Sequence, residues 1–392
     1  MRVFKCGPDF LDPQIHAVAS GAPCENVDLG MCGGDDIVWR LSCAAREADL
    51  ILVEGVMGLF DGTPSADELA RRLGLPILLV IDGRAMATSF GAIAFGLKHY
   101  RTGTPVTAAF ANNVGSAYHA QLLEQSLPAD IAWYGALPRD AEAAMPERHL
   151  GLLPAAEIED LARRIERMAD GLAETAAAQL PPAVSFPEVA PPEWPALLAG
   201  RTIAIARDAA FCFIYPANLD CLERLGARLV YFSPLADAVL PACDAVWLPG
   251  GYPELHADRL AANRPLWTAL AAHVAAGTPV LAECGGMMVL FETLIDVDGA
   301  AHPQAGLLPG TVTMQKRLAG LGMQEVDLPE GALRGHAFHY SRTETALVPL
   351  CRTRSLKTPT GEAVYRQARL TASYMHFYFP SNPAATAALL SP

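Results

Sequence analysis

The sequence of 392 residues is poor in charge, and above all in lysine. Charged residues make up 18% of the chain, the net charge is -13, and lysine occurs only as Lys5, Lys98, Lys316 and Lys357. No lysine follows a glycine, so the phosphate-binding motif G-x-x-x-x-G-K-[ST] is absent from these residues. The arginines form no clustered run, which argues against nucleic acid as a partner.

The sequence also lacks any apolar stretch of about 18 residues, the length that a membrane-spanning helix needs. Its nine cysteines show neither the regular spacing of a disulfide framework nor that of a zinc site. There is no signal peptide ahead of them. We therefore expect a cytoplasmic protein without a membrane partner, whose cysteines are reduced.

Hydrophobic residues reach 52%, which is typical of a packed globular protein. The length suits two domains of common size. Between them lies the stretch 181–200, PPAVSFPEVAPPEWPALLAG, with six prolines in its first fifteen residues. Proline disfavours both helix and central strand, so we predict a stiff linker there, with domains at 1–180 and 201–392.

Short apolar runs alternate with helix-like segments on both sides of this linker. The runs before it are VFKC, DLILVEGV, PILLVID, VTAAFANNV and IAWYGAL, and those after it are RTIAIARD, ARLVYFS, DAVWLPGG and TPVLAECGG. Runs that are apolar on both faces and are joined by helical crossovers predict buried parallel sheets. Both domains are therefore expected to be α/β.

The strongest chemical signal in the second domain is a cysteine in TPVLAECGGMMVLFETL. The strand-like run ends at Glu283, Cys284 follows, and Gly285 opens a predicted amphipathic helix. A lone cysteine is more often a core residue. A thiol at a sharp strand-to-helix turn is exposed to substrate, however, and we expect the helix N-terminus to lower its pKa toward the reactive thiolate. We therefore predict a catalytic nucleophile.

Two further stretches supply what such a nucleophile needs. Gly250 and Gly251 in DAVWLPGGYPELH follow a strand end, where backbone N–H groups can face an oxyanion; we count Gly285 with them. His376 in LTASYMHFYFPSNP is the candidate base. Each signal is weak alone, since most Gly-Gly pairs are only turns and most single histidines are structural.

Together these stretches resemble the glutamine amidotransferase domain of the cobyric acid synthase type, within the class I superfamily. The resemblance covers the chain from about Arg201 and rests on LPGGYPELHA, AECGGMM, GHAFHYS and SYMHFYF. It implies that Cys284 attacks the side-chain amide of L-glutamine, forms a thioester and releases ammonia, with His376 activating the thiol. It leaves a third member of the triad unidentified. Ala337 departs from the pattern, where the resemblance implies Glu.

Carboxylates stand at two strand ends of the first domain. Glu54 and Asp61 lie in DLILVEGVMGLFDG, while Asp9 and Asp12 lie in FKCGPDFLDPQIH, where prolines stiffen the turn. Any one of these acids alone is more often a solvated loop residue. Their coincidence past buried strands indicates a site for Mg²⁺ and phosphate.

This half resembles the ATP-binding domain of the cobyrinic acid a,c-diamide synthases, a dethiobiotin synthetase-like group of P-loop enzymes. The carriers are FKCGPDFLDPQIH, LVEGVMGLFDG, PILLVIDGRAMATSFGAIAFGL, NNVGSAYH and LPRDAEAAMPERHLGL. The resemblance makes Asp9, Asp12 and Glu54 ligands of Mg²⁺ or of the ATP phosphates, and it brings Lys5 to the phosphates. It puts Asp61 near a corrinoid carboxylate.

The family's first strand and phosphate loop are missing from residues 1–392. We therefore expect a gap as wide as one strand in the first sheet, flanked by apolar surface, and hypothesise that the natural protein begins upstream. Arg84 and Arg207, each just past a strand end, are candidate partners for substrate carboxylates. Cys6 is expected in the core and His16 on a helix surface, with substrate contact as its alternative.

The function expected from both resemblances is ATP- and glutamine-dependent amidation of the a and c carboxylates of cobyrinic or hydrogenobyrinic acid in cobalamin biosynthesis. ATP would activate a carboxylate as acyl phosphate, and ammonia would displace the phosphate. One alternative is a related synthase acting on a nickel tetrapyrrole, or cobyric acid synthase. The other is a non-catalytic binding protein that has lost its phosphate loop. A homodimer is the expected assembly.

Overall fold

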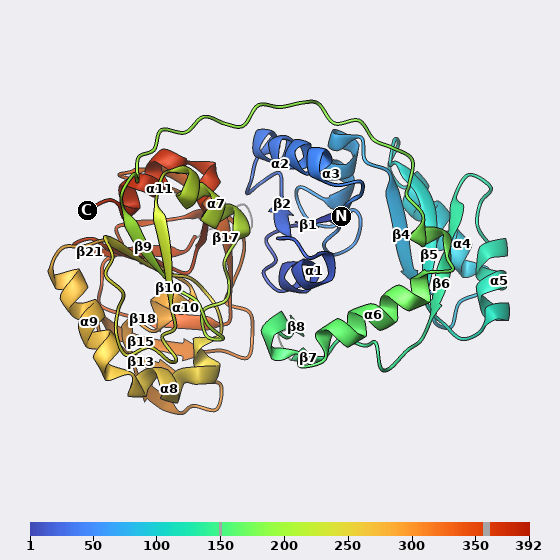
Figure 1. The fold of residues 1–392 in the computed structure, drawn as a ribbon. Helices are drawn as coiled ribbons and strands as arrows, with labels where there is room; N and C mark the ends of the chain where they lie inside the picture. The colour runs from blue at the N-terminus through green and yellow to red at the C-terminus, as the bar shows by residue number, and fades with distance from the viewer. Residues whose placement is uncertain (149–150, 356–360) are drawn as a thin grey trace. The chain divides into compact units, whose positions relative to one another are not determined.

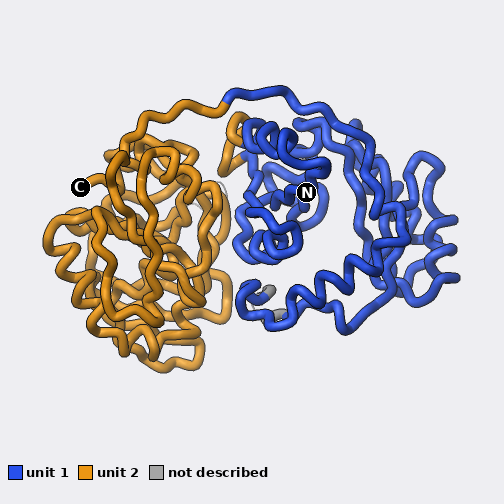
Figure 2. The backbone as a smooth tube through the Cα atoms, in the orientation of Figure 1, with its two compact units in different colours: residues 1–29, 37–190 blue, residues 30–36, 191–392 orange. Residues whose placement is uncertain are grey.

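The computed structural model describes residues 1–148, 151–355 and 361–392. His149 and Leu150, near the end of the stretch LPRDAEAAMPERHLGL, and Lys357 lie outside them. The chain divides into two compact units, the first made of Met1–Leu29 and Ile37–Ala190, the second of Gly30–Asp36 and Pro191–Pro392 (Figure 2). The boundary between Ala190 and Pro191 lies inside the proline-rich stretch 181–200.

Residues 30–36 group with the second unit, which the sequence did not indicate. Within that unit, Nη2 of Arg334 donates to the backbone oxygen of Cys32 at 3.0 Å. The hydroxyl of Tyr378 donates to Oδ2 of Asp36 at 2.6 Å. A short early segment is therefore held by residues about three hundred positions later in the chain.

The first unit begins with a parallel sheet of order β2-β1-β3. Its central strand is the most buried of the three, and Phe4 is completely covered. The strands and the two helices between them are β1 (Arg2–Cys6), α1 (Asp12–Ser20), β2 (Glu25–Val27), α2 (Gly34–Glu47) and β3 (Ile51–Glu54) (Figure 1). As expected, Cys6 is buried.

A second parallel sheet of order β4-β5-β6 follows in the same unit. Its apolar side chains, among them Leu79, Val106 and Ala109, pack with Phe90 and Leu123 of the crossover helices. The elements are β4 (Ile77–Asp82), α4 (Ser89–His99), β5 (Val106–Val114), α5 (Ala117–Gln125) and β6 (Ala132–Pro138). The five strands predicted before the linker are thus all present and parallel.

No strand among the described residues joins these two sheets. β3 pairs only with β1, and β4 pairs only with β5. Both strands expose large apolar side chains, with Leu52 at 45%, Leu78 at 41% and Val80 at 65%. Parallel strands are normally covered on both faces, so these two edges are unusually bare for an α/β sheet. The exposed apolar side chains agree with the expectation, whereas the missing strand between the two sheets stays a prediction.

The remaining elements of the first unit lie outside these sheets. Ser65 begins α3 with a capping box, in which its hydroxyl accepts from the Glu68 N–H and the Glu68 carboxylate accepts from the Ser65 N–H. Ile15 of α1 packs with Ile158 and Leu161. The elements are α3 (Ala66–Leu73), β7 (Glu147–Arg148), β8 (Gly151–Leu152) and α6 (Leu161–Leu172).

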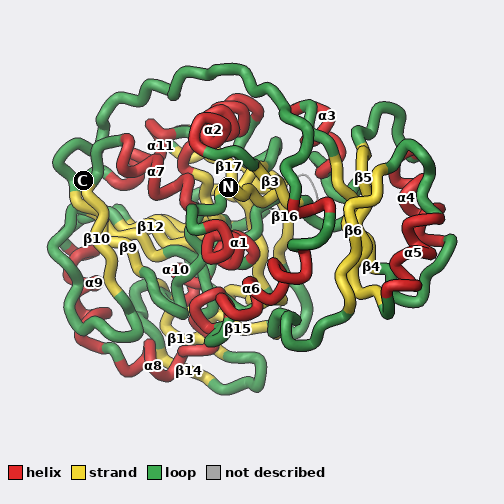
Figure 3. The backbone as a smooth tube through the Cα atoms, turned by 45° about the vertical axis from the view of Figure 1, so that its right-hand side comes forward, coloured by secondary structure: helices red, strands yellow, loops and turns green. Residues whose placement is uncertain are grey.

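The second unit is built on a seven-stranded sheet of order β10-β9-β11-β12-β22-β21-β19. β10, β9, β11, β12 and β22 are parallel to one another, and β21 pairs antiparallel with both β22 and β19. Figure 3 shows β10, β9 and β12 side by side in this sheet. The strands of this sheet are β9 (Thr202–Ala206), β10 (Arg228–Phe232), β11 (Ala245–Leu248), β12 (Val280–Glu283), β19 (Cys351–Arg352), β21 (Ala363–Gln367) and β22 (Leu370–Ser373). The four predicted strands form its parallel half.

Alternate residues of the central strands enter two separate cores. Ala204, Val246 and Ala282 belong to one core, whereas Ile205 and Trp247 belong to the other. β9, β11 and β12 are buried along their whole length. Burial on both faces explains why these segments read as continuous apolar runs.

Two four-stranded sheets complete the unit, and the sequence did not indicate them. Their orders are β14-β13-β15-β18 and β20-β16-β17-β23. The strands are β13 (Phe291–Ile295), β14 (Ala301–Pro303), β15 (Leu308–Met314), β16 (Gly320–Leu328), β17 (Gly331–His339), β18 (Ser341–Glu344), β20 (Arg354–Ser355) and β23 (His376–Tyr378). The helices are α7 (Pro216–Arg224), α8 (Ala257–Ala262), α9 (Arg264–Ala275), α10 (Gly285–Met288) and α11 (Pro383–Leu390). No helix in the described part of the chain is long and apolar enough to span a bilayer.

Candidate active site

Cys284 occupies a strained turn between β12 and α10. Its backbone angles are φ 45° and ψ −108°, a region that residues with a side chain seldom adopt. The Cys284 N–H donates to the Ser373 oxygen of the neighbouring strand β22 at 2.7 Å, and the Cys284 oxygen accepts from the Met288 N–H at 2.9 Å. The predicted strand-to-helix turn is present, and bonds to both sides hold its shape.

Two details of that prediction are wrong. The expected amphipathic helix after Cys284 is only the four-residue α10, because the chain enters β13 at Phe291. The pKa of the Cys284 thiol is raised, not lowered: burial is the largest cause, the Glu254 carboxylate adds to it, and the Gly285 N–H opposes it. So short a helix contributes little dipole, and the covered sulfur lies away from water. The resting thiol is therefore protonated.

The predicted glycines and the predicted base meet at this turn. The nitrogen of Gly251 lies 3.0 Å from the position that a Cβ on Gly285 would take. A Cβ on Gly250 would lie 2.2 Å from Cε1 of His376. The three glycines thus leave room for contact between the nucleophile turn, the β11 turn and the imidazole. The oxyanion role of the Gly251 N–H stays a prediction.

His376 is buried on β23, where it is paired in register with His336 of β17. Its pKa is lowered to about 3, chiefly by burial and further by the charges of His336 and His339. A neutral imidazole at pH 7 is the form that can accept a proton from a thiol. The ring of Phe213 lies 6.1 Å from the imidazole, centroid to centroid.

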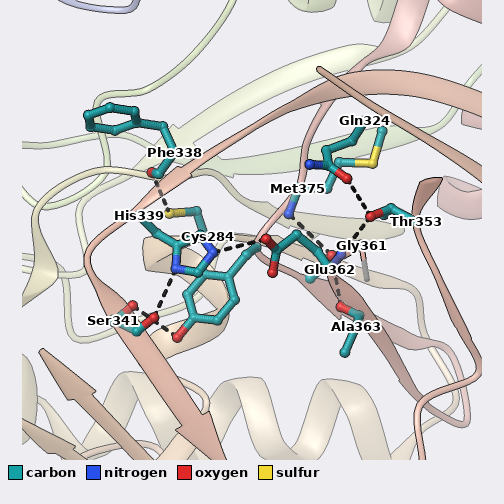
Figure 4. Close-up of polar contacts among 12 residues, drawn as sticks. Cys284, Gln324, Phe338, His339, Ser341, Thr353, Gly361, Glu362, Ala363 and Met375 are labelled. Carbon is teal, nitrogen blue, oxygen red and sulfur yellow. Dashed lines mark hydrogen bonds and ion pairs between the residues drawn. The ribbon is translucent and has the colours of Figure 1, made fainter. Parts of the chain in front are cut away.

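A second imidazole and a carboxylate lie near the sulfur (Figure 4). Sγ of Cys284 is 4.0 Å from the oxygen of Phe338, the residue before His339. His339 has Nδ1 2.9 Å from the Ser341 oxygen and Nε2 3.2 Å from Oε1 of Glu362. Its ring stacks on Tyr374 at 3.7 Å. The Ser341 oxygen and the stacked Tyr374 ring hold this imidazole in place, with the Glu362 carboxylate close to its Nε2.

Ala337 is completely buried on β17 and pairs in register with Gly322. Nothing in the structure explains why the chain carries alanine there.

In the first unit, the predicted cofactor residues cluster around a buried lysine. Nζ of Lys5 lies 2.6 Å from Oδ2 of Asp12, 3.0 Å from Oε2 of Glu54 and 3.1 Å from the Gly55 oxygen. Nε2 of His16 also forms a hydrogen bond with Oε2 of Glu54. Burial lowers the pKa of Lys5, but its bonds and charge interactions with Asp12 and Glu54 outweigh burial and raise it overall.

Asp9 belongs to the loop between β1 and α1. Its Oδ1 accepts from the N–H groups of Leu11 at 2.7 Å and Asp12 at 3.2 Å, and Nδ2 of Asn26 donates to its backbone oxygen at 2.8 Å. Burial, and then the charge of Asp12, raise the pKa of Asp9. The described residues contain no group of three or more His, Cys, Asp or Glu that could hold a metal ion on their own.

The three predicted substrate residues have other contacts. Oδ2 of Asp61 accepts from the Gly58 N–H at 3.1 Å and closes a turn. Arg84 is exposed and is paired with Asp82, with Nε 2.8 Å from Oδ2. Arg207 lies over the ring of Tyr231 at 5.3 Å. None of them contacts Lys5 or Cys284 in the described part of the chain, and their substrate roles stay predictions.

Sequence reasoning missed several polar groups near Cys284, and the signal for most of them was present. His336 and His339 lie in GHAFHYS and Tyr374 in SYMHFYF, two of the stretches that carry the resemblance, but no role was assigned to them. Glu283 directly precedes the cysteine. Glu362 stands in no motif, and only the pairing of β21 with β22 brings it to the site.

A glutamine amidotransferase is the class that this geometry and the sequence define together. The CobB/CobQ-like glutamine amidotransferase domain model matches residues 202–384. Relatives that align over the entire chain are a,c-diamide synthases, and the chain belongs to that family.

Three relatives show how extensive the similarity is. The hydrogenobyrinate a,c-diamide synthase of Stutzerimonas stutzeri is 56% identical over 100% of this chain and 91% of its own. The enzyme of the same name from Pseudomonas aeruginosa is 54% identical over 100% and 90%. The cobyrinate a,c-diamide synthase of Herminiimonas arsenicoxydans is 47% identical over 100% and 90%. Among solved structures, a crystal structure of a glutamine amidotransferase aligns at 19% identity over 48% of this chain and 96% of that chain, with TM-score 0.36.

Replacing Gly250 by alanine is expected to displace the His376 imidazole, because the added Cβ would lie 2.2 Å from Cε1. A misplaced base lowers the rate of the chemical step, and we expect glutamine hydrolysis to fall about 10- to 100-fold in kcat. The control is Gly96→Ala, where a Cβ meets nothing within 4 Å. Equal activity of both variants would contradict the contact.

The lowered pKa of His376 has a consequence for stability. With a folded pKa of about 3 against an ordinary 6.5, the unfolded state binds the proton more tightly, so stability is lost as pH falls from 6.5 toward 3. Between pH 7 and pH 5, we expect the free energy of unfolding of His376→Gln to fall by about 1–2 kcal/mol less than that of the wild type. Urea unfolding at the two pH values measures this. Identical losses in both proteins would contradict a buried neutral imidazole.

Proposed function

We propose that the protein amidates the a and c carboxylates of hydrogenobyrinic or cobyrinic acid, with glutamine as nitrogen donor and ATP as the activating co-substrate. The observation that carries the proposal is the 56% identity, over the whole chain, to a hydrogenobyrinate a,c-diamide synthase. Two close approaches in the second unit support the glutamine half of the reaction: Gly251 lies beside Gly285, the residue after Cys284, and His376 lies beside Gly250.

The neutral resting groups indicate the order of events at Cys284. His376 takes the thiol proton as Sγ attacks the amide carbon of glutamine, and the N–H of Gly251 stabilises the oxyanion. His376 then returns the proton to the leaving nitrogen, so ammonia departs and a thioester remains. Water attacks the thioester with proton transfer to His376 and releases glutamate. The thiol and the imidazole are both neutral again at the end.

The residues around Lys5 partly fit the Mg²⁺ and ATP that the second half of the reaction requires. Asp12 and Glu54 offer hard carboxylate oxygens at a strand end, and Mg²⁺ commonly uses one or two protein carboxylates together with phosphates. Lys5 adds a cation. When bound, ATP with Mg²⁺ would supply activation of the substrate carboxylate, which as an anion is a poor acceptor for ammonia.

Residues 1–392 do not contain the motif G-x-x-x-x-G-K-[ST], whose backbone N–H groups bind the phosphates. We propose that a further strand with a phosphate-binding loop joins the two sheets of the first unit between β3 and β4. The bare edges of those strands and the exposed Leu52, Leu78 and Val80 support this position. An additional parallel strand there would cover them.

Replacing Cys284 by alanine is expected to abolish amidation from glutamine, because no thioester can form. Amidation from ammonium chloride should persist, since the activating half is untouched. Both amidation reactions are measured by mass spectrometry of the tetrapyrrole product, with each nitrogen source in turn. The enzyme preparation must be able to use ATP. Glutamine-dependent product from the variant would exclude Cys284 as nucleophile.

Calorimetric titration with ATP and Mg²⁺ tests the activating half. We expect the 392-residue chain to bind ATP at least about 100-fold more weakly than a chain extended at its N-terminus by a strand, G-x-x-x-x-G-K-[ST] and a helix. The matched control carries alanine in place of the lysine in that added motif. Equal ATP affinity of the short and the extended chains would contradict the need for the added loop.

A further inference from the structure

The backbone that follows His376 is held by two buried side chains from other elements. The carboxyl Oε1 of Glu283 accepts from the Phe377 N–H at 3.0 Å. Glu283 is the last residue of β12, directly before Cys284, and is only 1% exposed. One side chain thus links the strand that ends at the nucleophile to the strand that carries the base.

Asn218 of α7 holds the same segment from another side. Its Nδ2 donates to the Phe377 oxygen and its Oδ1 accepts from the Phe379 N–H, both at 2.8 Å. Asn218 is 1% exposed. Both polar groups of Phe377 are therefore bonded to buried side chains, and the backbone on the C-terminal side of His376 has little freedom to shift.

This arrangement answers a need that the sequence leaves open. Phe377 and Tyr378 follow His376, so no carboxylate on the same strand orients its imidazole. An imidazole acting as base must nevertheless hold its place to well under 1 Å. His376 is in register with His336 of β17. The next backbone N–H, that of Phe377, is bonded to the residue directly before the nucleophile.

We infer that Glu283 is a positioning residue for the reaction of Cys284, because its bond to the Phe377 N–H fixes His376 relative to the thiol. Asn218 supports the same segment. The inference rests on the proposed function of Cys284 and His376. It assigns to Glu283 no contact with substrate and no proton transfer.

The bond needs an acceptor oxygen and not a negative charge. Burial raises the pKa of Glu283 to about 8, so the carboxyl is largely protonated at pH 7. A glutamine side chain offers the same Oε1 at the same distance from the backbone. Methionine has a similar length and shape but no oxygen acceptor. The pair Glu283→Gln and Glu283→Met therefore isolates the hydrogen bond from side-chain volume.

The test measures how fast iodoacetamide alkylates Cys284 at pH 7, followed by mass spectrometry of its peptide. We expect Glu283→Met to slow alkylation about tenfold and to move the rate profile to higher pH, since the thiol loses its base. Glu283→Gln should stay within about twofold of the wild type. Cys351, which is partly exposed, serves as internal reference in each sample.

Glu292→Met is the matched control variant. The Glu292 carboxylate also accepts a backbone N–H, from Gly310 at 2.9 Å, but it is exposed on β13. This variant should alkylate at the wild-type rate. Circular dichroism and urea unfolding of every variant show whether the fold is retained.

Two results would overturn the inference: alkylation of Glu283→Met at the wild-type rate with the wild-type pH profile, or equal slowing in Glu283→Gln and Glu283→Met. If Glu283→Met does not fold, the alkylation rate of Glu283→Gln decides alone. Slower alkylation of that variant would overturn the inference, because glutamine keeps a neutral acceptor oxygen. Glutamine hydrolysis by the wild type is measured separately. Its absence would count against the proposed function, whereas the alkylation rates still decide the role of Glu283.

Discussion

The second unit depends on a backbone turn that a cysteine would not adopt unaided. A positive φ at a residue with a Cβ costs on the order of 1–3 kcal/mol and persists only where the surroundings enforce it. Here the enforcement is visible: the Cys284 N–H is bonded to Ser373, and a Cβ on Gly286 would lie 2.1 Å from the Leu248 oxygen. The fully buried strands β11 and β12 cannot move apart to relax the turn. The strained turn is thus held by fully buried strands of the sheet.

Burial then determines the charge state of the site. It raises the pKa of the Cys284 thiol and of the Glu283 carboxyl, and it lowers that of His376, so all three groups are neutral at rest. A permanent thiolate-imidazolium pair would pay the desolvation of two ions. Neutral partners avoid that cost until glutamine arrives. In the proposed reaction, the charge that then develops would be stabilised by the Gly251 N–H, and a dipole that is already in place is most effective there.

Sequence patterns predicted those parts of the fold in which local composition and tertiary environment agree. The parallel strands were predicted correctly because both of their faces are buried, which gives continuous apolar runs in the sequence. The sheet of β13, β14, β15 and β18 did not, because its strands are partly exposed and lack a continuous apolar run. The lowered pKa expected for Cys284 was wrong because burial, which depends on the whole fold, outweighs a four-residue helix. Glu362 could not be found at all, since only strand pairing brings it to His339.

The cluster in the first unit brings together residues that were predicted to bind Mg²⁺ or phosphate, and that role stays a prediction. Asp12 and Glu54 do converge, but they converge on Lys5, whose ammonium is almost completely covered and needs both carboxylates as partners. A divalent cation or a phosphate would therefore have to share these groups with Lys5. A phosphate brings negative charge to the lysine and leaves the carboxylates for the cation, so the two can enter together more easily than either alone. The proposed binding of ATP and Mg²⁺ as one complex therefore fits this cluster better than a metal site that fills on its own.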